Sequence, residues 1–155
     1  MTPRDARAAL TIGGLCGVVA TVVMSVAMLG ARRAGLIEDL PPELITLAAL
    51  DGAGAHKPDE RTQDALAALL HMGFGSAAGA LFGLSYRLAR LPIPAVAQGV
   101  VYGGLVWLAS YAGWVPALGI MPPPARDEPR RPVVMVLAHW VYGGVLGALV
   151  DRLSH

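Results

Sequence analysis

The chain has 155 residues, of which 55% are hydrophobic and only 15% are charged, and its mean hydropathy is +0.55. This composition is far from that of a soluble domain. The net charge of +1 at pH 7 excludes a strongly basic surface, so no nucleic-acid partner is expected. Cys16 is the only cysteine, which excludes an intrachain disulfide and a thiolate zinc cluster.

Four apolar segments follow one another along the chain. They predict membrane-spanning helices at 10–31, 65–86, 93–115 and 133–150. A helix needs roughly 20 apolar residues to cross a hydrocarbon core of about 30 Å, and each segment meets or approaches that length. Strands of a membrane barrel would alternate polar and apolar residues, and these segments do not. The sequence therefore predicts an all-α integral membrane four-helix bundle that forms one domain over residues 1–155.

The segment 32–64 is expected to be the one substantial extramembrane loop. Within it, Pro41 and Pro42 are followed by apolar residues at helical spacing up to Leu50. Proline is favoured in the first turn of a helix, so this pattern predicts a short amphipathic helix. We expect that helix to lie on the membrane surface or over the mouth of the bundle. A second, shorter charged loop is expected at 126–131.

Two of the apolar segments repeat one another at an offset of 68 positions. Each holds a histidine followed by glycines four and eight residues later: His71, Gly75 and Gly79 in one, and His139, Gly143 and Gly147 in the other. The repeat predicts a duplicated transmembrane hairpin, with halves related by an axis along the membrane normal and with both histidines at one depth. Since residues four apart share a helix face, each histidine is expected above a groove of glycines.

Aromatic residues gather towards one membrane face. Trp107, Tyr111 and Trp114 follow the spacing i, i+4, i+7 in the third apolar segment, and Trp140 and Tyr142 lie early in the fourth. One interpretation is an aromatic belt at the membrane interface. The other is one wall of a pocket beside the two histidines, which makes Tyr111 and Tyr142 candidate ligand-binding residues.

The histidine pair is open to three specific interpretations and to a fourth, which is another small ligand or a proton-linked role. In the first, His71 and His139 are the axial ligands of a haem b whose flat macrocycle lies on the glycines. In the second, which we rank below haem, they bind copper with Met135, while Met24 and Met28 lie near the same membrane face. In the third, the histidines hydrogen-bond to neighbouring helices and the glycines serve close packing. Zinc is disfavoured because no aspartate or glutamate lies within a span.

Two functional hypotheses follow. The sequence shows no nucleophile–histidine–acid constellation and no phosphate-binding glycine loop, so the balance is against an enzyme. The leading hypothesis is a non-enzymatic accessory, assembly or structural subunit that packs against other membrane proteins or another copy of itself, because small-residue faces favour helix association in lipid. The alternative is a haem- or copper-binding protein that uses His71 and His139, with electron transfer as its role.

The basic residues bear on location and orientation. They are nearly all arginine, a bias that fits a GC-rich bacterial genome, so a bacterial inner membrane is expected. The termini and the short second loop share one membrane face and hold a compact set of arginines: Arg4, Arg7, Arg87, Arg90 and Arg152. The opposite face holds more basic residues: Arg32, Arg33, Lys57, Arg61, Arg126, Arg130 and Arg131. A raw count of Lys and Arg therefore favours the opposite orientation, whereas compact placement near the short turn favours cytoplasmic termini, which we expect.

Several short motifs resemble a known group of proteins. They are 20–25 (ATVVMS), 40–43 (LPPE), His71 with Gly75 and Gly79, 113–119 (GWVPALG), and His139 with Tyr142 and Gly143. Over most of its length the chain resembles the YagU-like family of small bacterial inner-membrane proteins. That resemblance implies a multi-helix membrane protein and no established chemistry, and it carries over no catalytic residue.

Overall fold

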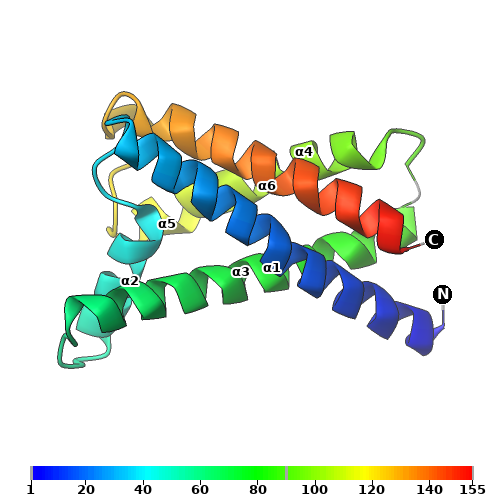
Figure 1. Cartoon of the computed structure of the whole chain (residues 1–155), viewed down its shortest axis with the longest axis horizontal. Coiled ribbons are helices and arrows are strands. Elements are labelled where there is room, and N and C mark those ends of the chain that lie inside the picture. Colours follow the sequence, from blue (N-terminus) through cyan, green and yellow to red (C-terminus); the bar gives the residue numbers. More distant parts are fainter. Residues whose placement is uncertain (1, 90, 155) are drawn as a thin grey trace.

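The computed structural model describes residues 2–89 and 91–154, and this part of the chain contains helices and no strands (Figure 1). Four helical stretches are long and apolar enough to cross a membrane: Pro3–Arg33, Glu60–Ala89, Ala95–Ala117 and Arg131–Leu153. They pack as a bundle, so the predicted all-α four-helix fold is confirmed. In chain order the elements are α1 (Pro3–Arg33), α2 (Pro41–Gly52), α3 (Glu60–Ala89), α4 (Ala95–Ala109), the π-helix η1 (Ser110–Trp114), α5 (Val115–Ala117), the 3-10 helix η2 (Pro124–Arg126) and α6 (Arg131–Leu153).

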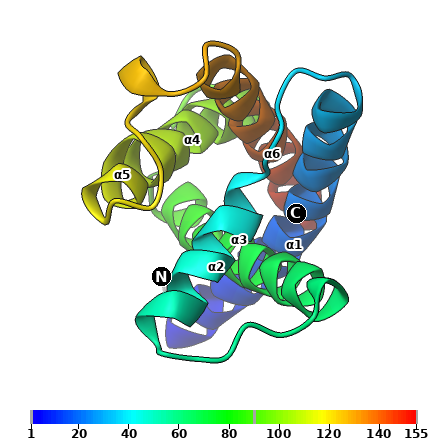
Figure 2. The ribbon, with the colours of Figure 1, turned by 90° about the vertical axis from the view of Figure 1, so that its left-hand side faces the viewer.

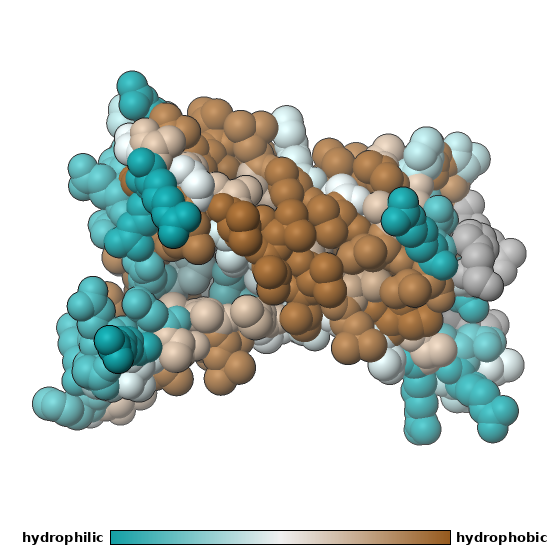
Figure 3. Space-filling view, in the orientation of Figure 1, coloured by the Kyte–Doolittle hydropathy of each residue, from teal (hydrophilic) through white to brown (hydrophobic). Residues whose placement is uncertain are grey.

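The outer surface of the bundle is apolar along its middle and polar at both ends (Figure 3). Large aliphatic side chains that are more than half exposed occur on every long helix, among them Leu15, Val26, Leu69, Leu81 and Leu105. A soluble monomer rarely exposes so much contiguous apolar surface. In lipid this surface contacts acyl chains, while the helices satisfy their own backbone hydrogen bonds.

The connection from α1 to α2 places α2 across one end of the bundle (Figure 2). Gly35 follows the end of α1 with φ of 68°, a left-handed conformation that glycine adopts without a steric penalty. Ile37 and Leu40 are buried and hold the connection against the bundle. Pro41 and Pro42 then occupy the first turn of α2, whose amide groups need no partner within the helix. The predicted short helix in the first loop is confirmed, and it lies over the mouth of the bundle.

Helices α1 and α3 pack with their backbones in direct contact. A Cβ atom added to Gly79 would lie 2.6 Å from Cα of Gly17, and one added to Gly83 would lie 2.5 Å from the carbonyl oxygen of Ala9. Real Cβ atoms do not approach other heavy atoms so closely, so these positions require glycine. In lipid, where apolar burial drives little association, such close approach provides the dispersion contacts that hold two helices together.

Helices α4 and α6 pack in the same way. A Cβ atom on Gly143 would lie 2.6 Å from the carbonyl carbon of Gly99, and one on Gly147 would lie 2.9 Å from the carbonyl carbon of Ala95. Gly143 and Gly147 are the partners, at an offset of 68 positions, of Gly75 and Gly79. The repeated glycines therefore have one physical role in both hairpins, which is to bring two helix backbones together.

The two hairpins meet through α1 and α6, and two tyrosines of the second hairpin bond to α3 of the first. The hydroxyl of Tyr142 in α6 donates to the carbonyl oxygen of Gly75 in α3 at 2.7 Å. The hydroxyl of Tyr102 in α4 donates to the carbonyl oxygen of Ala78 at 2.7 Å. Both chain ends lie at the end of the bundle opposite α2 (Figure 1).

The third span is not the regular helix that the sequence predicts over 93–115. It begins at Ala95 and changes to π-helical geometry over Ser110–Trp114. Pro116 follows, and its ring cannot donate a hydrogen bond and clashes with the preceding turn, which explains a widened turn here. Within this segment Tyr111 is buried, whereas Trp114 is partly exposed.

Replacement of Gly79 by alanine tests the backbone contact between α1 and α3. The added methyl group forces the helices apart, and overpacking of this kind costs about 1–3 kcal/mol. We expect Gly79→Ala to lower the thermal unfolding temperature of the protein in detergent. Gly73 lies on the same helix, and no atom lies within 4 Å of the position that an added methyl group would occupy there, so Gly73→Ala is the matched control. Equal unfolding temperatures for the two variants would contradict the packing described here.

Candidate functional site

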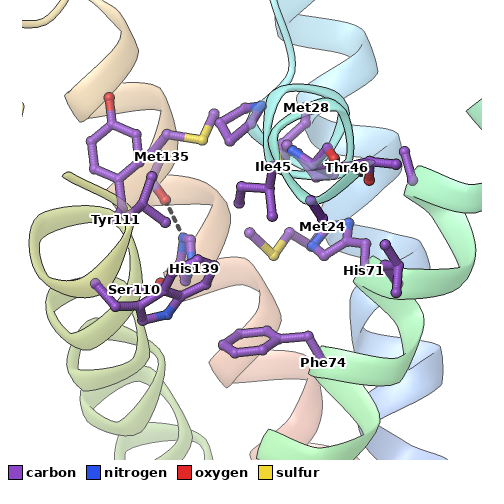
Figure 4. A pocket seen from close by; sticks show the side chains of 17 residues that line it. Met24, Met28, Ile45, Thr46, His71, Phe74, Ser110, Tyr111, Met135 and His139 are labelled. Carbon is purple, nitrogen blue, oxygen red and sulfur yellow. Dashed lines mark hydrogen bonds between the residues drawn. The ribbon is translucent and has the colours of Figure 1, made fainter. Parts of the chain in front are cut away.

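A cavity of about 310 Å³ lies between the two hairpins, at the end of the bundle that α2 covers (Figure 4). Side chains from α1, α3, α6 and the π-helical segment form its walls. Residues of α2 form its roof: Pro41, Pro42, Ile45, Thr46 and Ala49. No aspartate, glutamate, lysine or arginine is among the described residues that line it.

The structure brings His71 and His139 to this one cavity, His71 from α3 and His139 from α6. Three methionines join them in the lining: Met24 and Met28 from α1, and Met135 from α6. All three are at most 4% exposed, and His139 is 9% exposed. The expectation that the two histidines point into the bundle at a common site therefore agrees with the structure.

Each imidazole is held through its Nδ1 atom. Nδ1 of His139 lies 2.7 Å from the carbonyl oxygen of Met135. Because a carbonyl oxygen only accepts, Nδ1 carries the proton, and Nε2 of the neutral ring keeps a free lone pair. Nδ1 of His71 lies 3.4 Å from the hydroxyl of Ser25, and either group can donate. Within the described residues, neither Nε2 atom takes part in a hydrogen bond.

The hydroxyl groups in the lining are already engaged. Thr46 donates to the carbonyl oxygen of Pro42 at 2.8 Å, and Ser110 donates to that of Val106 at 2.6 Å. The hydroxyl of Tyr111 donates to the carboxylate of Asp127. The hydrogens of these hydroxyl groups are therefore used within the protein, and the lining also offers imidazole nitrogens and thioether sulfurs.

The predicted glycine grooves are filled. Gly75, Gly79, Gly143 and Gly147 lie against backbone or side-chain atoms of the neighbouring helix, with no space left beside them for a flat ligand. Tyr142 contributes to the lining of a smaller adjoining cavity of about 20 Å³ and not to that of the larger one. Of the predicted site residues, the structure thus gathers His71, His139, Tyr111 and Met135 at the larger cavity and places the glycines in helix packing.

A buried ion-pair cluster beside the cavity was missed at the level of sequence, where 126–131 was expected to be a charged loop. Arg131 donates to Asp127 at 2.7 Å and to Glu128 at 2.6 Å. The side chains of Arg131 and Asp127 are only 6% and 1% exposed. The spacing of four residues between Asp127 and Arg131 is the one signal in the sequence that could have suggested this pair.

A second cavity, also of about 310 Å³, adjoins the first, and its lining includes charged side chains. Arg32, Glu43 and Asp64 contribute to it, and Arg32 pairs with Glu43 at 2.9 Å. The two cavities share lining residues, including His71 and Met28. We call the second cavity the vestibule, because it leads from the polar end of the bundle towards His71.

Four helices of membrane-spanning length, packed through glycines around an internal cavity, define an α-helical multi-pass membrane protein. The chain belongs to a family of unknown function, DUF6789, whose model matches residues 8–155. No curated protein and no solved structure matches the chain. The resemblance to the YagU-like group stays a prediction.

Removal of Arg131 tests the importance of the buried cluster. Arg131→Ala leaves the buried carboxylate of Asp127 without its cationic partner, a change that costs about 3–5 kcal/mol in comparable sites. We expect a large fall in the thermal unfolding temperature. Arg32→Ala breaks a partly exposed pair that contributes at most about 1 kcal/mol, and serves as the control. An equally small effect of both substitutions would show that the cluster does not stabilise this end of the bundle.

Proposed function

We propose that the protein binds a small ligand in the cavity between its hairpins, in contact with His71 and His139. The observation that carries this proposal is the convergence of two imidazoles from different hairpins on one preformed and largely apolar space. A ligand site of this kind combines an apolar wall with a few polar atoms that fix orientation. The two free Nε2 atoms meet that description.

The position of the histidines within the spans supports the same conclusion. Ionisable residues are costly inside a membrane, and those that occur there commonly face a cavity and serve a function. His71 and His139 both face the cavity, whereas His56 lies exposed in the polar loop. The placement of His71 and His139 is therefore typical of intramembrane histidines that serve a function.

The accessory-subunit hypothesis loses its main support. It was motivated by small-residue faces, which in lipid favour association with a partner helix. In the structure the principal small-residue faces contact one another within the chain. They are formed by Gly13 and Gly17, Gly75 and Gly79, Gly99 and Gly103, and Gly143 and Gly147. A role in the assembly of a membrane complex, with other proteins or a second copy as partner, stays a prediction.

Haem b is also less well supported than the sequence suggested. Its axial ligation would use His71 and His139, but a macrocycle was expected to lie on the four repeated glycines. Those glycines are covered by neighbouring helices. A smaller ligand fits the observed lining better than a large planar one.

We further propose that the protein lies in a bacterial inner membrane with cytoplasmic termini. In that orientation α2, the vestibule and the cavity mouth face the periplasm, because they lie at the end opposite the termini (Figure 1). Basic residues at the terminal end support this orientation. One of them, Arg90, lies outside the described residues.

Native mass spectrometry tests for a bound ligand. The protein is released from its own membranes in lipid nanodiscs, and its mass is compared with the mass of the bare chain. We expect a stoichiometric bound species in the wild-type protein that is lost from the His71→Ala/His139→Ala double variant. His56→Ala, which alters an exposed histidine, is expected to retain it. Wild-type protein that carries no bound species would contradict the proposed function.

Cysteine labelling tests the orientation. In a Cys16→Ala background, Ala55→Cys places one thiol in the exposed loop after α2. We expect a membrane-impermeant maleimide to label this thiol in intact cells. Labelling that requires permeabilised cells would place this loop, and the cavity mouth with it, in the cytoplasm.

A further inference from the structure

We propose that the ligand is a copper(I) ion, bound by the Nε2 atoms of His71 and His139 and by the thioether sulfur of Met24. This inference rests on the proposed function and names the ligand of the same cavity. It is supported by the positions of the donor atoms, their chemistry, the lack of charged residues in the described lining and the route of access.

The three donors come together where two cavities meet. Met24, His71 and His139 line both the larger cavity and the small cavity of about 20 Å³ that adjoins it. They come from three different helices, α1, α3 and α6. In the view of Figure 4 the sulfur of Met24 is seen between the two imidazole rings. This junction is therefore where we place the ion.

The donors are neutral and soft. Imidazole nitrogen and thioether sulfur suit copper(I), whereas carboxylate and carbonyl oxygens suit magnesium, calcium and manganese. The described residues that line the larger cavity include no carboxylate and no thiolate, and the described part of the chain holds no cluster of three or more histidine, cysteine, aspartate or glutamate side chains. A structural zinc site needs four such ligands, so this donor set disfavours zinc.

Charge favours the same ion. A cation that leaves water for a low-dielectric interior loses hydration energy, and the loss grows steeply with its charge. The donors here bring no negative charge to offset it. A monovalent ion that forms strong bonds to soft neutral donors is therefore better accommodated than a divalent one.

A hydrogen bond orients the His139 imidazole for ligation. A metal-binding histidine usually donates its second ring N–H to a carbonyl or carboxylate, which fixes the tautomer and the ring orientation. His139 does this through Met135, whose carbonyl oxygen lies 2.7 Å from Nδ1. The Ser25 hydroxyl lies 3.4 Å from Nδ1 of His71, and Nε2 of His71 is free to ligate when Nδ1 is the donor.

The vestibule provides access for a cation. Asp64, Glu43 and Arg32 contribute to its lining, with Arg32 paired to Glu43, and His71 and Met28 lie on the boundary that it shares with the larger cavity. A cation attracted by the Asp64 carboxylate would meet Met28 and His71 before it reached Met24 and His139. Met28 thus offers an intermediate thioether contact along the path.

Competition for copper(I) tests this proposal. Purified full-length protein in nanodiscs is titrated with copper(I) under anaerobic, reducing conditions against bicinchoninate, a chelator that colours when it holds the metal. We expect one copper(I) per chain, with nitrogen and sulfur neighbours in the X-ray absorption spectrum. Loss of a ligand should weaken binding by more than about tenfold, since even outer-shell changes have effects of that size.

Two methionine variants provide the matched comparison. Met24→Leu keeps the volume of the side chain but removes the thioether, so we expect weaker binding and loss of the sulfur signal. Met121→Leu alters another buried methionine that is not part of the cavity lining, so its affinity should equal that of the wild-type protein. His71→Gln, with folding checked by circular dichroism, gives a second reading if Met24→Leu is unstable.

The outcomes separate this inference from the proposed function. Failure of the wild-type protein to compete for copper(I), together with a different bound species in native mass spectra, would overturn the copper site and leave the ligand cavity standing. Copper(I) bound equally well by the wild-type, Met24→Leu and His71→Gln proteins would overturn the assigned ligand set. Weaker copper(I) binding in Met24→Leu and His71→Gln, with unchanged binding in Met121→Leu, would establish the assigned ligand set.

Discussion

Direct contact between helix backbones at glycine is the constraint on which the structure depends. Lipid offers little drive for apolar side chains to associate, so helices in a membrane need close approach to gain dispersion contacts. Gly17 and Gly79 supply that approach between α1 and α3, and Gly99 and Gly143 supply it between α4 and α6. Two rigid hairpins result, and the positions of α1 and α6 at their shared boundary determine which side chains face the centre.

The cavity is a consequence of where these contacts stop. Gly75 packs against Thr21, and one turn further along the two helices stand Met24 and His71, which line the cavity. Beyond these glycine contacts the helices are separated by side chains, and α2 covers the resulting cavity at the end of the bundle. The same glycine crossing that stabilises each hairpin thereby leaves room at one end of the bundle. A site built on two such hairpins is pre-organised, because its donors are carried by packed helices.

The sequence was sufficient for the spans, the short helix at Pro41 and the histidine pair, because apolar length, proline position and periodicity are local properties. It was insufficient for contacts between elements. The repeated glycines defined a helix face correctly, but spacing cannot tell whether a ligand or another backbone covers that face. The turn before Pro116 is π-helical over Ser110–Trp114, which a regular helical wheel does not anticipate. Burial of Arg131 depends on Asp127 and on tertiary packing that no local pattern reports.

The most direct test of the account is a cross-link between positions 71 and 139. In a Cys16→Ala background, the His71→Cys/His139→Cys protein is treated in native membranes with dibromobimane, which fluoresces once it bridges two thiols. The account predicts a fluorescent intrachain cross-link for this pair. It predicts none for His71→Cys/Leu137→Cys, because Leu137 lies on the same helix but is half exposed on its outer surface. Absence of the first cross-link, or equal yield from both pairs, would show that the two hairpins do not bring the histidines to one site.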